Sequence, residues 1–354
     1  MKRGLALEGG GARGAYQAGA IKALNRKKIY FDIAAGTSIG SMNAAFYVAK
    51  KCQEMEKVWS KINTKDILGI EGQVLADIHN KKFNFAEIRK EFDTIKEIIK
   101  NAGVDTKHLR RLLEKYINEE KFMKSNIDYG LVTFSISDMK PVEVYKNEMV
   151  KGKLIDYIIA SSHLPGFKFE RIIDDKYYLD GGVHLNCPID MLLDRGCDEI
   201  YAIRLWTGKL KYNQIKGTKV HIIKPSEDLG SILAVTPELS EYKMKLGYYD
   251  TLKYIDKLDG TKYYFKKYDK KYYDSLFDKP TYKRMLKKYN KNKEPKSSKE
   301  FILRTIEKVC NEMGIERFKI YNTPFLLTKL KYKMVEHKNN NYYDFIKSIK
   351  VSFE

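Results

Sequence analysis

The chain has 354 residues, of which 43% are hydrophobic, and this length allows one large domain or two ordinary ones with packed cores. No stretch approaches the roughly 20 consecutive apolar residues of a membrane-spanning helix, so any contact with a membrane is expected from outside the bilayer. The four cysteines show neither a C-x-x-C pair nor a metal-ligand spacing: Cys52, Cys187, Cys197 and Cys310. We therefore expect free thiols in a reducing cytoplasm.

The formal net charge of +20 is concentrated toward the C-terminus. Residues 251–354 carry 26 lysines and arginines against 13 acidic residues, and residues 1–250 carry 40 against 33. A basic surface attracts phosphates, either of nucleic acid or of anionic lipid headgroups. A bias toward lysine, tyrosine and asparagine that only keeps the protein soluble gives the same balance. The charge alone does not decide between these interpretations.

The first 225 residues alternate short apolar runs with segments of helical spacing. Strands are predicted at Gly4–Leu7, Phe31–Ala35, Leu131–Ser135, Val142–Tyr145, Lys176–Leu179, Glu199–Ile203 and Val220–Ile223. Helices are predicted at Ala15–Asn25, Ser41–Ile62, Phe85–Ala102, Thr106–Ile117 and Pro188–Asp194. This alternation predicts an α/β layered fold with a mainly parallel sheet, which binds ligands beyond the carboxyl ends of its strands.

Two stretches depart from that alternation. Residues 63–125 are an insertion rich in lysine and in apolar residues at helical spacing, and they predict either a cap over the substrate or a plain pair of packing helices. Beyond residue 225 the pattern becomes helical, with a polar linker expected at Lys287–Ser298. Helices are predicted there at Leu229–Leu233, Ser240–Leu258, Phe301–Met313 and Pro324–Glu336.

The pentapeptide Gly36-Thr37-Ser38-Ile39-Gly40 lies between a predicted strand and a predicted helix. A serine on a sharp turn in this context is typical of a nucleophile held in a strained backbone conformation. The residues flanking such a turn need to be nearly without side chains, and Gly36 and Gly40 meet that need. The sequence therefore predicts that Ser38 forms an acyl-enzyme ester.

The segment Gly9-Gly10-Gly11-Ala12-Arg13-Gly14 follows the first strand and opens a helix. It fits the dinucleotide fingerprint G-x-G-x-x-G, and Asp32 even follows at a suitable distance. However, Asp32 begins its strand, whereas a ribose-binding acid ends it, so the acid would lie at the wrong end of the sheet. We favour an oxyanion site, in which consecutive glycines expose main-chain N–H groups at a helix N-terminus and Arg13 adds positive charge.

A serine nucleophile needs a base. Of the six histidines, His163 and His184 lie in loops rich in glycine and proline, so a Ser-His-Asp triad stays conceivable. The segment Asp180-Gly181-Gly182 follows a predicted strand and places a carboxylate at a turn. An isolated Asp-Gly-Gly is usually just a turn. A functional role for Asp180 is supported by the other sequence blocks that accompany this segment.

Taken together, these blocks resemble the patatin-like phospholipases, lipid acyl hydrolases that use a Ser-Asp dyad. The similarity covers about residues 1–265. The matching blocks, in order, are the glycine loop Gly9–Gly14, the serine turn Gly36–Gly40, Ala160–Pro165, the segment Asp180–Gly182 with Asn186 and Pro188, and the closing helix around Leu246–Asp250. The resemblance implies a three-layer α/β sandwich over residues 1–265, followed by a basic, mostly helical region over residues 266–354.

The resemblance also implies roles for individual residues. Ser38 would be the nucleophile and Asp180 the proton acceptor, with Gly10, Gly11, Arg13 and Ile39 around the oxyanion. Ester hydrolysis of this kind requires no metal and no other cofactor. Because a free aspartate titrates near pH ~3.9, Asp180 would need burial in an apolar pocket to become an effective base.

Three functions are therefore compared. The favoured one is a lipid acyl hydrolase that is cytoplasmic and peripheral at an anionic membrane surface, with phospholipid or lysophospholipid as substrate. The second is a soluble esterase or thioesterase. The third is a non-enzymatic scaffold for nucleic acid or protein, since tyrosines and lysines alternate over Tyr263–Tyr273. Nucleic acid is disfavoured as a partner, because ordinary amphipathic helices give this pattern more often.

Overall fold

The computed structural model describes residues 1–68, 105–164, 167–168, 170–210, 212–213, 216–290 and 294–350. The chain forms two compact units, an N-terminal unit over Met1–Thr251 and a C-terminal unit over Leu252–Glu354. The domain boundary expected after residue 265 falls inside the C-terminal unit, at the end of strand β8 (Tyr264–Phe265). The predicted helix Phe85–Ala102 lies outside the described residues, as does much of the expected insertion.

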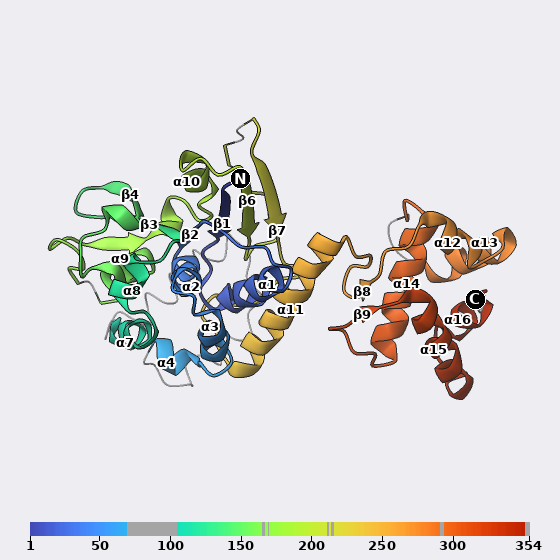
Figure 1. The fold of residues 1–354 in the computed structure, drawn as a ribbon. Helices are drawn as coiled ribbons and strands as arrows, with labels where there is room; N and C mark the ends of the chain where they lie inside the picture. The colour runs from blue at the N-terminus through green and yellow to red at the C-terminus, as the bar shows by residue number, and fades with distance from the viewer. Residues whose placement is uncertain are drawn as a thin grey trace. The chain divides into compact units, whose positions relative to one another are not determined.

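The N-terminal unit is built around one seven-stranded sheet, shown in Figure 1. Its strands run in the order β4-β3-β2-β1-β6-β7, and β5 pairs with β3. All pairs are parallel except those that β4 and β5 make with β3. The bounds are β1 Arg3–Leu7, β2 Ile33–Thr37, β3 Asp128–Ser135, β4 Lys140–Tyr145, β5 Tyr178–Asp180, β6 Glu199–Ile203 and β7 Lys219–Ile223. The predicted α/β fold with a mainly parallel sheet is confirmed.

Helices cover both faces of this sheet, because its central strands are apolar on both sides. On one face, side chains of α10 pack against alternate residues of β1, β2 and β6. On the other face α2 lies so close that a Cβ added at Gly40 would be 2.1 Å from the Leu7 carbonyl oxygen. The described helices of this unit are α1 Ala15–Arg26, α2 Ile39–Val48, α3 Cys52–Trp59, α4 Thr64–Leu68, α7 Lys107–Tyr116, α8 Glu119–Met123, α9 Leu154–Ser161 and α10 Ile189–Asp194, together with most of α11 Pro237–Asp256, whose last turn belongs to the C-terminal unit.

Helices α1 and α11 cross in close contact, and glycine makes this contact feasible. A Cβ added at Gly19 would lie 1.9 Å from the Met244 carbonyl oxygen, and one added at Gly247 would lie 1.9 Å from that of Tyr16. The Tyr16 hydroxyl also donates to Asp250 over 3.3 Å. The block around Leu246–Asp250 therefore secures the helix that follows the glycine loop.

Two helix predictions for this unit were wrong. The segment Ser41–Ile62 forms two helices, and Lys50 between them takes a positive φ of 58° that ends the first helix. Leu229–Leu233 is not helical, because Gly230 has φ 75° and the Ile232 carbonyl accepts a hydrogen bond from the Ala12 N–H at 2.7 Å. Tertiary contacts override local periodicity at both places.

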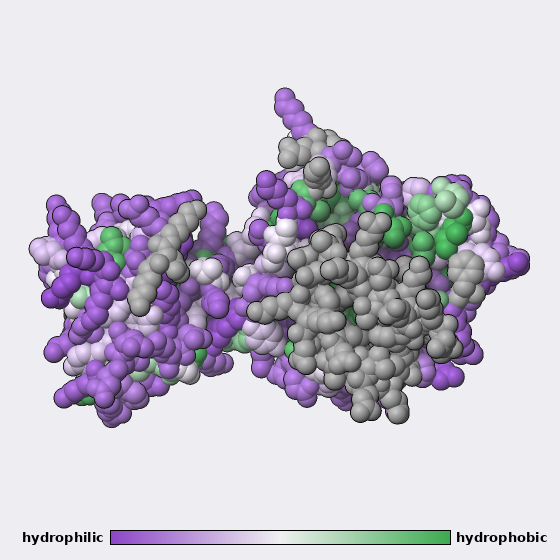
Figure 2. All heavy atoms as spheres, turned by 180° about the vertical axis from the view of Figure 1, so that it is seen from behind, coloured by the Kyte–Doolittle hydropathy of each residue, from purple (hydrophilic) through white to green (hydrophobic). Residues whose placement is uncertain are grey.

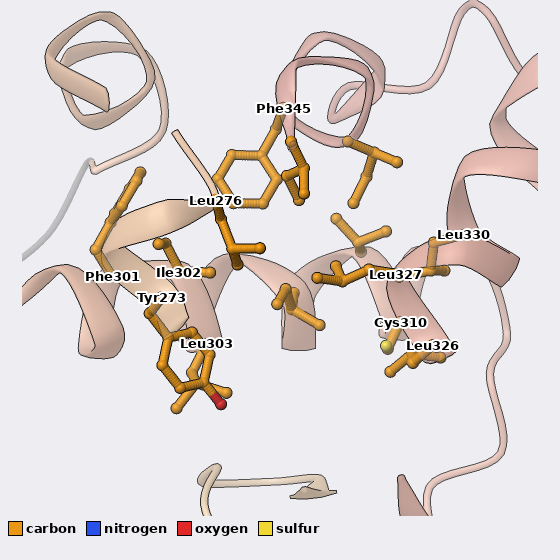
Figure 3. Close-up of a cluster of buried hydrophobic side chains, with 14 of the residues drawn as sticks. Tyr273, Leu276, Phe301, Ile302, Leu303, Cys310, Leu326, Leu327, Leu330 and Phe345 are labelled. Atoms are coloured by element: carbon orange, nitrogen blue, oxygen red, sulfur yellow. The ribbon is translucent and has the colours of Figure 1, made fainter. Parts of the chain in front are cut away.

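The C-terminal unit is mainly helical and has a core of its own, part of which Figure 3 shows. Its helices are α12 Lys270–Ser275, α13 Lys279–Tyr289, α14 Ser298–Glu312, α15 Thr323–Glu336 and α16 Tyr343–Ser348, and β8 pairs with β9 (Ile320–Tyr321). The expected linker Lys287–Ser298 begins inside α13, which Asp278 caps by accepting from the Thr281 N–H. The predicted helical character of this region is confirmed.

Candidate active site

Ser38 occupies a single-residue turn between β2 and α2. Its backbone has φ 55° and ψ −127°, a conformation that costs a non-glycine residue free energy and persists only where the surroundings enforce it. The turn is so tight that a Cβ added at Gly36 would lie 2.2 Å from the Gly40 carbonyl carbon. The strained serine turn that the sequence predicted is thus present in the fold.

Hydrogen bonds hold this turn from both sides. The Ser38 N–H donates to the Ser161 Oγ at the end of α9 over 3.0 Å, and the Ser41 N–H donates to the Ser38 carbonyl over 2.8 Å. The sequence predicts no role for Ser161, although this residue lies in a block of the family resemblance. Its hydroxyl is a support for Ser38 that no local pattern reveals, because the two residues are far apart in the chain.

The pairing of β3 brings Asp180 to Ser38. β2 runs parallel to β3 and ends with Thr37 opposite Val132, whereas β5 runs antiparallel to β3 and ends with Asp180 opposite Thr133. The two strand ends therefore approach each other beside consecutive residues of β3. Ser38, which follows β2, and Asp180, which ends β5, are brought together for this reason.

Asp180 is buried and only partly satisfied by hydrogen bonds. Its Oδ1 accepts from the Gly182 N–H at 2.8 Å, while its Oδ2 makes no regular hydrogen bond to any described residue. Burial raises the pKa of Asp180 to about 6, and hydrogen bonding from the Ser38 hydroxyl and the Gly182 N–H opposes that rise. The hydroxyl thus lies within reach of the carboxylate, and such contacts often tighten only when substrate binds.

The glycine loop lies beside Ser38 and is fixed by Asn186. The Gly9 N–H donates to the Asn186 carbonyl over 2.9 Å, and the Asn186 side-chain amide donates to the Gly9 carbonyl over 3.2 Å. Gly11 has φ 53°, and a Cβ there would lie 2.1 Å from the Ile232 carbonyl oxygen. The remaining motif glycines also stand where a Cβ would collide with a neighbour: Gly9, Gly10, Gly14, Gly181 and Gly182.

Three main-chain N–H groups near Ser38 are open to a ligand. Within the described residues, the N–H groups of Gly10, Gly11 and Ile39 donate to no acceptor. Gly11 and Ile39 also line a cavity of about 90 Å³ that has Ser38 at its wall. Most of its other lining is apolar: Met42, Phe46, Met55, Val58, Trp59, Ile62, Leu109, Leu112, Leu113, Leu164, Phe167, Ile232, Leu233 and Val235. The site therefore combines Ser38 and main-chain N–H donors with an apolar cavity.

The sequence model of the patatin-like phospholipase family matches residues 5–193, which are more than half of the chain. The chain belongs to this family. The matched range contains the glycine loop, the Ser38 turn and Asp180, so the family assignment and the geometry concern the same part of the molecule.

Relatives match part of the chain at low identity. Lysophospholipase nte1 of Aspergillus niger is 25% identical over 262 residues, which are 73% of this chain and 16% of that protein. Patatin-like phospholipase domain-containing protein 6 of Mus musculus is 26% identical over 209 residues, which are 56% of this chain and 13% of that protein. The chain thus spans about one sixth of the fungal relative. The crystal structure of VipD from Legionella pneumophila aligns with 93% of this chain and 79% of its own, at 15% identity and a TM-score of 0.45.

Arg13 lies behind the glycine loop of this patatin-like site. Its guanidinium donates to the carbonyls of Gly230 at 2.8 Å and Leu205 at 3.4 Å, stacks 3.8 Å above the Trp206 ring and pairs with Asp228 at 3.5 Å. These contacts give Arg13 a structural role that joins distant segments to the loop. That Arg13 stabilises the oxyanion stays a prediction. Its positive charge would act there through long-range electrostatic attraction.

A second buried cation supports the same loop. The Lys243 ammonium of α11 is buried and donates to the Ala12 carbonyl over 3.1 Å. Burial lowers the pKa of Lys243 to about 8, and the positive charge of Arg13 adds to that effect. Sequence reasoning missed this residue, because a lysine on an amphipathic helix is normally exposed.

The two candidate histidines are placed differently from a catalytic base. His163 is buried, its Nε2 lies 3.2 Å from the Lys168 carbonyl oxygen, and its own carbonyl accepts from the Asp180 N–H at 2.9 Å. Its main chain thus positions Asp180, while its ring contacts a different segment. His184 is half-exposed and lies 3.5 Å from Glu143. Within the described residues, neither ring is hydrogen-bonded to Ser38 or Asp180.

Two further properties concern the described residues alone. No group of three or more histidine, cysteine, aspartate or glutamate side chains in that part of the chain is arranged to bind a metal ion. In the same part of the chain, every helix is too short or too polar to traverse a bilayer.

Proposed function

We propose that the protein is a serine lipid acyl hydrolase that uses Ser38 as nucleophile and Asp180 as proton acceptor. The observation that carries this proposal is a strained serine at the wall of an apolar cavity, with the buried, half-satisfied carboxylate of Asp180 within reach of its hydroxyl. A carboxylate whose pKa is about 6 is a far better base at neutral pH than an ordinary aspartate, yet it is still mostly ionised.

The first half of the reaction forms an acyl-enzyme. Asp180 takes the proton of the Ser38 hydroxyl as Oγ attacks the ester carbonyl carbon. The carbonyl oxygen gains the negative charge, and the N–H groups of Gly10, Gly11 and Ile39 stabilise it. Each such donor lowers the barrier by about 3 kcal/mol. When the tetrahedral intermediate collapses, the ester bond breaks and Asp180 returns the proton to the departing alcohol.

The second half regenerates the serine. A water molecule gives its proton to Asp180 and attacks the acyl carbon, with the same three N–H groups stabilising the oxyanion. The bond to Ser38 Oγ breaks, the proton passes to that oxygen, and the fatty acid leaves. One carboxylate serves both halves, so the mechanism does not require a histidine.

The cavity supports a fatty-acyl substrate. Its wall offers methionine, leucine, valine and aromatic side chains beside Ser38, so an alkyl chain would replace water there at a gain in free energy. The relatives named lysophospholipase favour a phospholipid or lysophospholipid. We propose that the protein meets this substrate at the surface of an anionic cytoplasmic membrane. A soluble ester or thioester is the competing substrate class.

The test uses two isosteric or smaller variants of the dyad. Ser38→Ala and Asp180→Asn should each lower fatty-acid release from phospholipid vesicles by at least about a thousandfold, as for other nucleophile and base deletions. A fluorophosphonate probe should label the wild type and not Ser38→Ala. Ser240→Ala, at a buried serine of α11 that makes no hydrogen bond to the Ser38 turn, is the matched control and should keep both labelling and turnover. Undiminished hydrolysis by Ser38→Ala would refute the proposal.

A wild type that hydrolyses monomeric short-chain esters or thioesters as fast as vesicle lipids would identify a soluble esterase instead. That outcome would agree with Ser38 and Asp180 as the catalytic dyad and would refute a membrane phospholipid as the substrate. Comparing the two substrate forms therefore separates the chemistry of Ser38 from the location of its substrate.

A further inference from the structure

Helix α15 of the C-terminal unit presents apolar side chains to solvent. Phe325 is 72% exposed, Tyr332 71% and Val335 64%. Residues seven apart lie on one side of a helix, as do residues three apart, so the three side chains share one side. Two exposed lysines, Lys329 and Lys333, border this side, and the exposed Glu336 lies on it one turn after Tyr332. We call Phe325, Tyr332, Val335 and the two lysines the α15 outer face.

The opposite side of α15 already satisfies the core. Leu326, Leu327 and Leu330 are buried in the main cluster of the C-terminal unit, together with Met334. Figure 3 shows the three labelled leucines of α15 lying against side chains of α14, including Cys310. The α15 outer face is thus not needed to close this core, and its aromatic groups are free to serve another purpose.

The C-terminal unit that carries this face has an excess of basic residues. Residues 252–354 contain 26 lysines and arginines against 13 acidic residues. Within the described residues, Lys329, Lys333 and Lys338 form no ion pair, and Glu336 places one opposite charge on the same side of α15. Figure 2 shows a mainly hydrophilic surface on the C-terminal unit, in which hydrophobic side chains are few. A single exposed apolar residue on such a surface is ordinary, but three on one side of the same helix mark a candidate contact surface.

We propose that the α15 outer face docks the protein on an anionic phospholipid bilayer. Phe325 and Val335 would enter the apolar boundary, Tyr332 would place its ring there with its hydroxyl at the headgroups, and the lysines would reach the phosphates with their alkyl stems against the apolar layer. An anionic bilayer matches both the apolar side chains and the lysines of this face. A protein groove would match only the apolar side chains, and a nucleic acid only the lysines. This inference rests on the proposed function, because it explains how a lipid hydrolase reaches its substrate.

The main experiment measures cosedimentation of the full chain with vesicles. Every protein carries Ser38→Ala, so that no lipid is hydrolysed during the measurement. The vesicles consist of phosphatidylcholine alone or mixed with phosphatidylglycerol. Phe325→Ser/Tyr332→Ser should lower the partition coefficient on the mixed vesicles by more than about tenfold. The matched control, Tyr30→Ser/Met139→Ser, removes two equally exposed apolar side chains of the N-terminal unit and should bind as before.

A charge variant distinguishes the two contributions. Lys329→Gln/Lys333→Gln should weaken binding to the mixed vesicles by about tenfold or more, since each lysine near an anionic surface contributes about 1 kcal/mol. The same variant should bind phosphatidylcholine vesicles like its parent. Equal binding of all variants to mixed vesicles would overturn the proposal. Variants that lose self-association and keep vesicle binding would also overturn the proposal, because the face would then be a contact between two copies of this chain.

Turnover separates this proposal from the proposed function. With an active Ser38, Phe325→Ser/Tyr332→Ser should lose vesicle hydrolysis and keep full activity on a monomeric short-chain ester. If the variant also loses activity on the soluble ester, the face contributes to folding or catalysis and the docking proposal fails. If Ser38→Ala retains activity, the proposed function fails whatever the vesicle-binding result.

Discussion

The two units of the molecule bury their polar side chains very differently. Of the 25 polar or charged residues that are buried within the described parts of the chain, 22 lie in the N-terminal unit and three in the C-terminal unit. Two of those three, Thr305 and Glu307, are hydrogen-bonded to main-chain groups of their own unit. The C-terminal unit thus follows the ordinary rule of an apolar core within a charged surface.

The N-terminal unit departs from that rule at the proposed active site. Ser38 is buried in a strained conformation, Asp180 is buried with an unsatisfied oxygen, and Lys243 is a buried cation. Each arrangement costs free energy, and the costs concentrate around one strand end and one loop. The comparison teaches that unfavourable burial of polar groups is concentrated in one unit, whereas the other keeps its charges at the surface, which suits the proposed division between catalysis and docking.

The largest effect on stability should come from neutralising Asp180. Its folded-state pKa of about 6 lies above the unfolded value of 3.8, so the native state binds more protons between these two values. The free energy of unfolding therefore falls as pH rises from about 4 to about 6, by on the order of 3 kcal/mol in total. Asp180→Asn carries no charge and should be more stable than the wild type by about that amount at pH ~8, with little gain at pH ~4.

Calorimetric unfolding at the two pH values measures this gain. The gain should appear in the transition of the N-terminal unit and leave that of the C-terminal unit unchanged. The exposed Asp174→Asn is the control and should show no such pH-dependent gain. An equal gain of Asp180→Asn at both pH values would show that packing, rather than the buried charge, is responsible.

The next effect concerns the pH dependence of catalysis. Asp180 must be ionised to accept the serine proton, so kcat/KM should fall about tenfold per pH unit below about 6. The assay uses a monomeric ester, because this removes any influence of pH on vesicle binding through the C-terminal unit. A wild-type profile that stays flat between pH ~5 and ~7 would contradict Asp180 as the base.

The sequence predicted those features that local pattern dictates. Glu199–Ile203 forms β6 with the predicted bounds, because a short continuous apolar run suits a strand that is buried on both faces. The serine turn was predictable because only glycine fits at Gly36 and Gly40. The fold class followed from the alternation of such elements.

Features that depend on distant partners could not be predicted in this way. The meeting of Ser38 and Asp180 requires the order of β2, β3 and β5, which local periodicity does not contain. Arg13 and Lys243 are separated from most of their partners by about 200 residues. A positive charge in a glycine loop predicts a role toward a ligand, whereas the fold uses the Arg13 side chain to join segments behind the loop.

The smallest expected effect tests whether the buried cation behind the glycine loop belongs to the catalytic apparatus. Lys243 holds the Ala12 carbonyl and brings positive charge close to the proposed oxyanion site. Lys243→Met keeps the length of the side chain and should lower kcat/KM at neutral pH by roughly threefold to tenfold, because a single charge near the oxyanion contributes about 1 kcal/mol.

The pH profile distinguishes this role from simple packing. The pKa of Lys243 is about 8, so the wild type should lose activity by a similar factor as pH rises through that value, on the alkaline side of the rise that Asp180 sets. Lys243→Met should lack the alkaline decline while keeping the acid one. An equal loss of activity at pH ~7 and pH ~9 would show that the Lys243 side chain acts by packing α11 against the glycine loop. The proposed catalytic apparatus of the N-terminal unit would then consist of Ser38 and Asp180 without the charge of Lys243.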